Sequence, residues 1–313
     1  MGMILSCLIV DFMKTSFIFP AFISEYFGNE PDILNSLSDD FCNFKNITAS
    51  VVNPDFRSFS TEDKSFTNDE LNSQIISYIF SCSLCNILKN KKKIIPDYVA
   101  GNSMGLYAAL FCSGSVSFED GLHLIINAYK FIREKVAVMD AGMGSIIGLD
   151  IDDVRKIVEH YNNKIEIVNA NNKHSFLISG EMAGIKKVLE LARDEGALFT
   201  SELNVKSPYH THYLNEVSEK FYNFIKKNIS IGPSVITIVS AVDQSFLSSK
   251  DELSNEIVRN ISTPINWQAT MQKMLDSDVS RFFECGAGNT LYKIGKFIKG
   301  SFTIYPINQI ERV

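Results

Sequence analysis

Residues 98–110 read "YVAGNSMGLYAAL" and place Ser103 between two glycines, directly after an apolar run that is typical of a buried strand. A G-x-S-x-G pattern between a strand and a helix is the signature of a nucleophile elbow. In such an elbow the glycines allow a sharp backbone turn and the serine projects from it. The pattern also occurs by chance in plain tight turns. The strand-like run before Ser103 and the helical pattern after it favour a nucleophile.

A nucleophilic serine needs an oxyanion donor and a base. At a helix N-terminus, the backbone amide of Met104 would face the oxyanion formed by attack on a carbonyl group. The chain contains five histidines, namely His123, His160, His174, His210 and His212. The first two fall in predicted helices and the third opens a predicted strand. His210 and His212 lie in the segment "VKSPYHTHYL", a Pro-containing loop from which either side chain could reach the elbow.

The periodicity on both sides of residue 141 predicts the fold class. Residues 141–205 follow the order βαββαβ, which is the order of a ferredoxin-like module. Outside this segment strands alternate with helices, which predicts a mostly parallel sheet with helices on both faces. We therefore predict an α/β fold of the hydrolase-like kind, with residues 1–140 and 206–313 forming a large domain and residues 141–205 an inserted ferredoxin-like subdomain. Ligands of such sheets bind at the carboxyl ends of the strands, where Ser103 falls.

The first 60 residues give a weaker pattern. One apolar strand-like piece, "SFIFP", is followed by a stretch rich in Asn, Asp and Ser, which is typical of loops and helix ends. The N-terminal "MGMILSCLIV" lacks a basic region and becomes polar after ten residues, so it is too short to span a membrane and a poor secretion signal. It matches the loose myristoylation pattern, which occurs often by chance.

Composition argues against several classes of protein. The chain has 313 residues, of which 45% are hydrophobic, so it can bury a large core. Its net charge is −6 and its only dense basic run is "KNKKK" at 89–93, which is more typical of a solvated helix end than of a nucleic-acid site. We expect neither a nucleic acid nor a membrane as a partner.

The six cysteines lie mostly in apolar stretches, as reduced core cysteines do, which favours a cytoplasmic protein. Cys82 and Cys85 form a C-x-x-C, but they fall within an apolar helical pattern and have no second pair or histidine cluster nearby. A core position is therefore preferred over metal or redox chemistry. We expect no metal and no bound cofactor.

Four segments in this order and spacing, "GNSMGLYAAL", "SPYHTHYL", "STPINW" and "FFECGAGNTL", resemble the malonyl-CoA:acyl carrier protein transacylases and the acyltransferase domains of polyketide synthases. The resemblance covers residues 90–300 well and the first 60 weakly. It implies an acyltransferase of fatty acid, polyketide or antibiotic biosynthesis. Its substrate would be a phosphopantetheine thioester, carried by CoA or by an acyl carrier protein, and its partner an acyl carrier protein.

Carried over residue by residue, the resemblance implies that Ser103 is the nucleophile and His210 the base of a Ser-His dyad. The family's P-x-H spacing makes His212 a neighbour of the site rather than the catalyst. The imidazole is held in the family by a backbone carbonyl near an Asn-Pro pair, which is Thr263-Pro264 here. The second oxyanion amide comes from an N-terminal motif whose best local match is "FPAFISE" at 19–25, with Phe22 at the position of the motif's glutamine.

Departures from the family motifs bear on the acyl group. Asn102 replaces the histidine that precedes the serine. Ala128, 25 residues after Ser103, replaces the arginine that holds the free carboxylate of malonyl groups. Arginine suits that task because its planar fork binds a carboxylate with two hydrogen bonds. Arg133 lies five residues further on, about 140° around the helix, and cannot stand in for it. With Asn102, Ala128 and His212 around the substrate, we expect an acyl group other than malonyl.

Three functions stay open from the sequence. The first is a carrier-protein acyltransferase with an acyl-Ser103 intermediate. The second is an acyl-carrier-protein hydrolase of the proofreading kind, which the absence of the arginine favours because that arginine helps to steer the ester away from water. The third is a non-catalytic relative that binds a carrier protein, suggested by the altered N-terminal motif and Asn102. The presence of both Ser103 and His210 argues against the third.

Overall fold

The structure, a computed structural model, describes residues 13–21, 25–161 and 164–312. Cys7, the N-terminal apolar segment and Phe22 lie outside these residues. Within them, a six-stranded sheet has the order β10-β9-β1-β2-β7-β8. Its strands are β1 (Lys14–Phe19), β2 (Tyr98–Gly101), β7 (Thr237–Val239), β8 (Phe246–Leu247), β9 (Val279–Glu284) and β10 (Thr303–Tyr305). All neighbouring pairs are parallel except β7 with β8.

Helices cover this sheet. They are α1 (Glu30–Leu37), α2 (Asp40–Val51), α3 (Lys64–Thr67), α4 (Glu70–Asn86), α5 (Gly105–Cys112), α6 (Phe118–Val136), α9 (Asn215–Asn228), α10 (Lys250–Ser262), α11 (Trp267–Leu275) and α12 (Thr290–Gly295). Short helical turns are η1 (Pro54–Arg57), η2 (Ile87–Lys91), η3 (His212–Leu214) and η4 (Ile307–Arg312).

The side chains of β1 show that both faces of the sheet are buried. Phe17 and Phe19 belong to a core cluster with α4, α5 and α6, whereas Ile18 packs in a second cluster with Trp267 and Met271 of α11. Because successive side chains of a strand point to opposite faces, helices must lie on both sides. The prediction of a mostly parallel sheet between two helical layers is confirmed.

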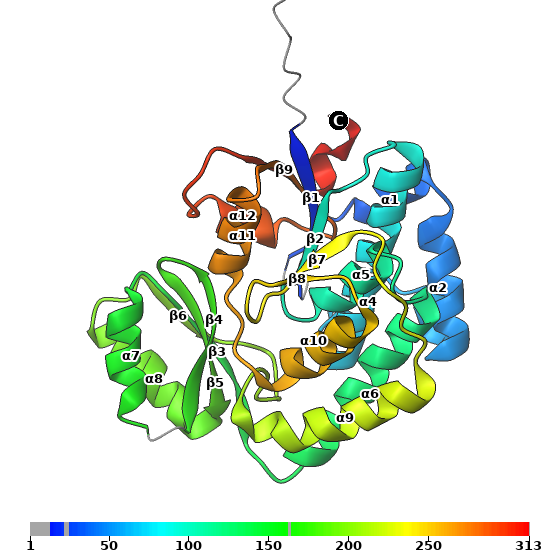
Figure 1. The fold of residues 1–313 in the computed structure, drawn as a ribbon. Helices are drawn as coiled ribbons and strands as arrows, with labels where there is room; N and C mark the ends of the chain where they lie inside the picture. The colour runs from blue at the N-terminus through cyan, green and yellow to red at the C-terminus, as the bar shows by residue number, and fades with distance from the viewer. Residues whose placement is uncertain (1–12, 22–24, 162–163, 313) are drawn as a thin grey trace, which may run out of the picture.

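A second sheet of four strands has the order β4-β5-β3-β6 and is antiparallel throughout. It consists of β3 (Ala141–Ile147), β4 (Ile165–Asn172), β5 (Ser175–Glu181) and β6 (Phe199–Glu202), with α7 (Ile151–Glu159) and α8 (Met182–Asp194). These elements bury their own apolar cluster. Figure 1 shows them, in green, beside the large sheet. The ferredoxin-like element order is thus present, while the domain bounds drawn from the sequence stay a prediction.

The first third of the chain is more helical than the sequence suggests. Residues 30–57 form α1, α2 and η1, where polar loops and helix ends were expected. Leu34, Phe41 and Phe44 are buried against the main core. The many Asn, Asp and Ser residues hide this pattern, because they serve as caps and exposed faces around a few apolar anchors; Asn53, for example, caps η1.

Helix α4 is the central core helix. Together with η2 it is, among the described residues, the one helix long and apolar enough to cross a membrane, and 78% of its apolar window is buried inside the fold. Cys82 and Cys85 are free and buried on it, and burial raises the pKa of both thiols well above the usual range. Both cysteines occupy the core positions predicted for them.

Candidate active site

The elbow lies at the carboxyl end of the central strand β2. Ser103 has a φ of 54°, in the left-handed region that non-glycine residues rarely adopt. A Cβ atom on Gly101 would lie 2.1 Å from the backbone nitrogen of Leu106, and one on Gly105 would lie 2.1 Å from the carbonyl oxygen of Phe19. The two glycines are therefore required because the strand, the turn and helix α5 approach each other too closely for a side chain.

Ser103 and His210 form a hydrogen-bonded pair. The distance from Ser103 Oγ to His210 Nε2 is 2.7 Å, although 107 residues separate them. His210 lies in the loop between β6 and η3, is 3% exposed, and also has a left-handed φ, of 62°. Its backbone N–H donates to the carbonyl oxygen of Ile261 at 2.8 Å, which fixes this loop on α10. The fold thus holds a serine hydroxyl and an imidazole in hydrogen-bonding contact, the arrangement that a nucleophile and its base require.

The burial of His210 favours its neutral form. Desolvation lowers the pKa of the imidazole to about 4, while the backbone carbonyl groups of Asn260 and Thr263 act in the opposite direction. Nδ1 is buried and has no hydrogen-bond partner of ordinary geometry among the described residues. At neutral pH the ring is uncharged, and Nε2 can accept the serine proton.

Helix α10 supports both members of the pair. Asn260 Nδ2 donates to the carbonyl oxygen of Ser103 at 3.1 Å, and the next residue, Ile261, binds the His210 amide. Because one helical turn contacts the nucleophile and the base together, its position sets their separation.

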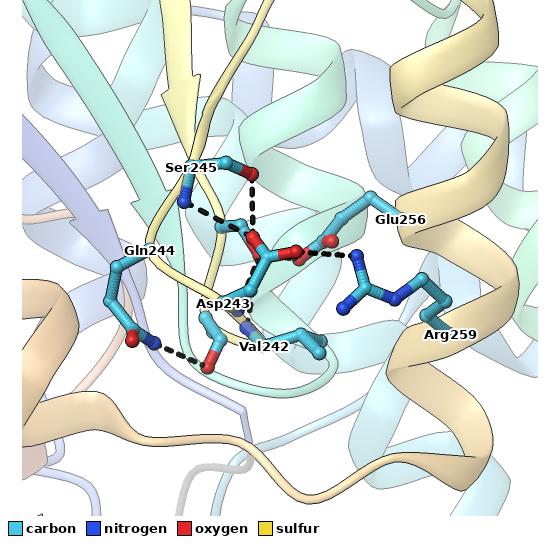
Figure 2. A network of polar contacts seen from close by, with 8 residues as sticks. Val242, Asp243, Gln244, Ser245, Glu256 and Arg259 are labelled. Atoms are coloured by element: carbon cyan, nitrogen blue, oxygen red, sulfur yellow. Dashed lines mark hydrogen bonds and ion pairs between the residues drawn. The ribbon is translucent and has the colours of Figure 1, made fainter.

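The same helix is anchored to the end of the large sheet. Figure 2 shows Asp243, in the loop after β7, accepting hydrogen bonds from Ser245 and from Arg259, whose Nη1 lies 2.6 Å from Asp243 Oδ2. Glu256, one turn earlier on α10, accepts from Ser240 Oγ at 2.7 Å. Arg259 directly precedes Asn260, so this network restrains the turn that holds the Ser-His pair.

One backbone N–H at the N-terminus of α5 is available as a hydrogen-bond donor beside Ser103. The N–H groups of Gly105 and Leu106 donate to the carbonyl groups of Asn102 and Ser103. The N–H of Met104 has no acceptor within the described part of the chain and lies next to the nucleophile. It can therefore donate to an oxyanion formed beside Ser103 Oγ, as expected from the sequence.

A narrow pocket opens next to Ser103. It is lined by Gln74, Ser103, Met104, Tyr107, Ala128, Tyr129, Ile132, Tyr209, His210, Asn260 and Ile261. Its volume is about 10 Å³, room for about one water molecule. Ala128 is buried at its wall, where the resemblance places an arginine. Arg133 is not among the described lining residues, and its Nη1 donates to the Lys206 carbonyl instead.

Two of the expected pocket residues lie beside the pocket rather than on its wall. Asn102 is buried, and its Oδ1 accepts from Asn169 Nδ2 of β4 at 3.4 Å, which links the elbow to the small sheet. His212 is half-exposed and pairs with Glu166 of β4. The structure therefore brings together Ser103, Met104, Ala128 and His210, and places Asn102 and His212 at the junction of the two sheets.

The polar residues at the pocket that the sequence did not single out include Gln74, Tyr209 and Asn260. Tyr209 directly precedes His210 in the quoted "SPYH", so its place next to the predicted base could have been inferred from the sequence. Gln74 is a lone polar residue at the start of the apolar run of α4, which is a weak signal. Asn260 gives no signal, because its contact with Ser103 spans 157 residues.

Comparisons with known proteins identify the family of the chain. A family model described as "Acyl transferase domain" matches residues 78–296. The malonyl CoA-acyl carrier protein transacylase of Bacillus subtilis (strain 168) is 24% identical over 223 residues, 70% of each chain. That of Staphylococcus aureus (strain COL) is 24% identical over 304 residues, 96% of this chain and 97% of the relative.

Solved structures share the fold. One is a type II polyketide synthase acyl-carrier protein in complex with its malonyl-transacylase, with a TM-score of 0.86 and 21% identity, covering 94% of this chain and 96% of that one. Another is the malonyl CoA-acyl carrier protein transacylase of Coxiella burnetii, with a TM-score of 0.85 and 22% identity, covering 96% and 95%. The chain therefore belongs to the acyl transferase domain family, and the protein is an acyltransferase.

Proposed function

We propose that this acyltransferase moves an acyl group from a CoA or carrier-protein thioester, through an ester on Ser103, to the phosphopantetheine thiol of an acyl carrier protein. The observation that carries the proposal is the 2.7 Å contact between Ser103 Oγ and His210 Nε2 at the N-terminus of α5. The carrier protein as acceptor is supported by the relatives, which are named malonyl CoA-acyl carrier protein transacylases.

In the first half-reaction, His210 Nε2 takes the proton of Ser103 as Oγ attacks the thioester carbonyl carbon. The Met104 amide stabilises the oxyanion. The carbon–sulfur bond then breaks, His210 returns the proton to the departing thiolate, and an acyl-serine remains. In the second half-reaction the carrier thiol gives its proton to His210, attacks the ester and releases the Ser103 hydroxyl.

We further propose that the acyl group is not malonyl. Ala128 offers neither a charge nor a hydrogen-bond donor, and no lysine or arginine lines the described pocket. A buried carboxylate without a cationic partner is strongly disfavoured. The pocket therefore suits an acyl chain without a second carboxylate.

The same observation favours a second candidate, hydrolysis of the acyl-serine. Without a cationic side chain that fixes the far end of the acyl group, water could attack the ester in place of a thiol. The free thiols of the five described cysteines support a reducing, cytoplasmic compartment, which suits both candidates. Neither candidate uses a metal or a bound cofactor, since the base and the oxyanion donor come from the protein.

The two outcomes are separated by following the acyl group. The protein is first loaded with an acyl-CoA, and the carrier protein in its phosphopantetheine form is then added under intact-mass detection. A transferase passes the acyl mass to the carrier, and loss of the ester depends on carrier concentration. A hydrolase releases free acid at a rate that the carrier does not change. Absence of any acyl-enzyme with every donor would leave a non-catalytic carrier-binding protein.

A further inference from the structure

A chain of three side chains orders the wall of the pocket. Tyr209 Oη donates to Glu70 Oε1 at 2.9 Å, and Gln74 Nε2 lies 2.9 Å from Tyr209 Oη. Glu70 begins α4 and is partly exposed, and its other oxygen accepts the backbone N–H of Lys206 at 3.2 Å. The chain runs from the molecular surface to the buried end of the pocket.

The direction of these hydrogen bonds is fixed. A carboxylate can only accept, so the tyrosine proton must point to Glu70. Burial and the negative charge of Glu70 raise the pKa of Tyr209 well above its usual value, so the hydroxyl keeps this proton. The tyrosine oxygen is then left as an acceptor, and the amide of Gln74 must turn its nitrogen toward it.

As a consequence, the other end of the Gln74 amide, its Oε1, is left without a partner in a residue that lines the pocket. Gln74 is 2% exposed, and its Oε1 has no hydrogen bond among the described residues. A buried carbonyl oxygen without a donor is costly, and this cost is removed by a ligand that brings one. Asn260 also lines this pocket, and its Oδ1 is a second buried acceptor without a partner among the described residues, while Nδ2 of the same amide donates to the Ser103 carbonyl oxygen.

The charges near the pocket also favour a hydrogen-bond donor over a carboxylate. Tyr129 also lines the pocket, and its pKa is raised by burial and by the negative charges of Glu70 and Asp69. An acyl carboxylate would meet acceptors and negative charge, whereas a hydroxyl or an amide N–H would meet the acceptor it needs. The pocket has room for about one water molecule, which matches the hydroxyl or N–H end of a short group.

We propose that Gln74 selects short acyl groups that carry a hydrogen-bond donor, a hydroxyl or an amide, which donates to Gln74 Oε1. The inference rests on the proposed function, because the acyl group must be attached to Ser103 to enter this pocket. Gln74 acts by contacting the substrate, and Tyr209 is a positioning residue that fixes the orientation of the Gln74 amide.

The test uses pairs of pantetheine thioesters that differ by one group. Propionyl is compared with glycolyl, and butyryl with 3-hydroxypropionyl and malonyl, and the rate of Ser103 acylation is followed by intact mass. We expect the hydroxyl member of at least one pair to load about 10- to 100-fold faster than its methyl counterpart, with malonyl slowest. In Gln74→Met, the acylation rates of the hydroxyl and methyl members of each pair should become similar. Tyr209→Phe should reduce the preference for the hydroxyl-bearing thioester, because the Gln74 amide is then free to rotate.

A matched control is Ser83→Ala, which removes another buried polar side chain from α4 away from the pocket and should leave the preference unchanged. Thermal unfolding shows that each variant is folded. Equal loading of methyl and hydroxyl members, or a preference that persists in Gln74→Met, would overturn the inference while the acyl-serine stands. Failure of every thioester to load would instead refute the proposed function, and the inference with it.

Discussion

The two ends of the pocket are built by different means. At the catalytic end, backbone geometry holds the groups: Ser103 and His210 both have left-handed φ angles, and Gly101 and Gly105 leave no room for a Cβ atom. At the acyl end, positions depend on side chains: Gln74 and Tyr209 form a hydrogen-bonded chain with Glu70, and Ala128 lines the same pocket.

This contrast indicates which end of the pocket tolerates amino-acid substitutions. A substitution at the catalytic end disturbs the backbone of a buried turn, so the chemistry resists alteration. A substitution at the acyl end alters one hydrogen bond or one charge and leaves the Ser-His pair in place. The acyl group is therefore the property that sequence change can alter most easily in this molecule.

The sharpest difference should come from the histidines. His210→Ala removes the base from Ser103 and should lower the rate of acylation about 10³-fold. His212→Ala, two residues away, only breaks the pair with Glu166 and should leave the rate little changed. Single-turnover acylation by intact mass measures both. If the acylation rate falls only slightly in His210→Ala, or falls more in His212→Ala, His210 is not the base.

Measurements of folding stability test whether close backbone packing constrains the elbow. Gly105→Ala places a Cβ atom against the Phe19 carbonyl and should lower the free energy of unfolding by about 3–5 kcal/mol. Gly232→Ala is the matched control, because its added Cβ would lie 3.9 Å from the nearest atom, the carbonyl oxygen of Ser115. Denaturant unfolding compares the two. Similar stabilities would mean that the elbow is not constrained as the geometry indicates.

The pH profile tests the burial of the base. A histidine with a pKa of about 4 stays neutral, and competent as a base, down to about pH 5, whereas one at 6.5 would be mostly protonated there. We expect the rate of Ser103 acylation at pH 5 to be close to that at pH 7, and about 30-fold higher than an ordinary histidine would allow. An acylation rate that falls with a midpoint near 6.5 would contradict this.

A change at the acyl end should be smaller and confined to specificity. Ala128→Arg supplies a cation to the pocket and should raise malonyl loading about 10-fold relative to Ala128→Met, which adds similar length without charge. Intact-mass loading with malonyl-CoA and butyryl-CoA gives the ratio for each folded variant. Rapid malonyl loading on the unmodified protein would overturn the proposal that the missing arginine excludes malonyl.

Sequence reasoning succeeded where the signal is local. The elbow and the apolar α4 each follow from a pattern within about twenty residues, and the ferredoxin-like order follows from consecutive short elements between residues 141 and 205; the structure contains all three. It failed for α1 and α2, where polar caps obscure a few buried phenylalanines, and for Gln74, whose partner Tyr209 is 135 residues away. Contacts across such separations depend on how β1, β2 and α4 pack, which no local pattern contains.

The most direct test of the proposed mechanism is whether Ser103 itself carries the acyl group. The unmodified protein and Ser103→Ala are incubated with the same acyl-CoA panel, and the intact masses and the peptide containing residues 98–110 are measured. The account predicts an added acyl mass on this peptide in the unmodified protein, lost on addition of carrier protein, and none in Ser103→Ala. An adduct that persists in Ser103→Ala, or none in either protein, would contradict it.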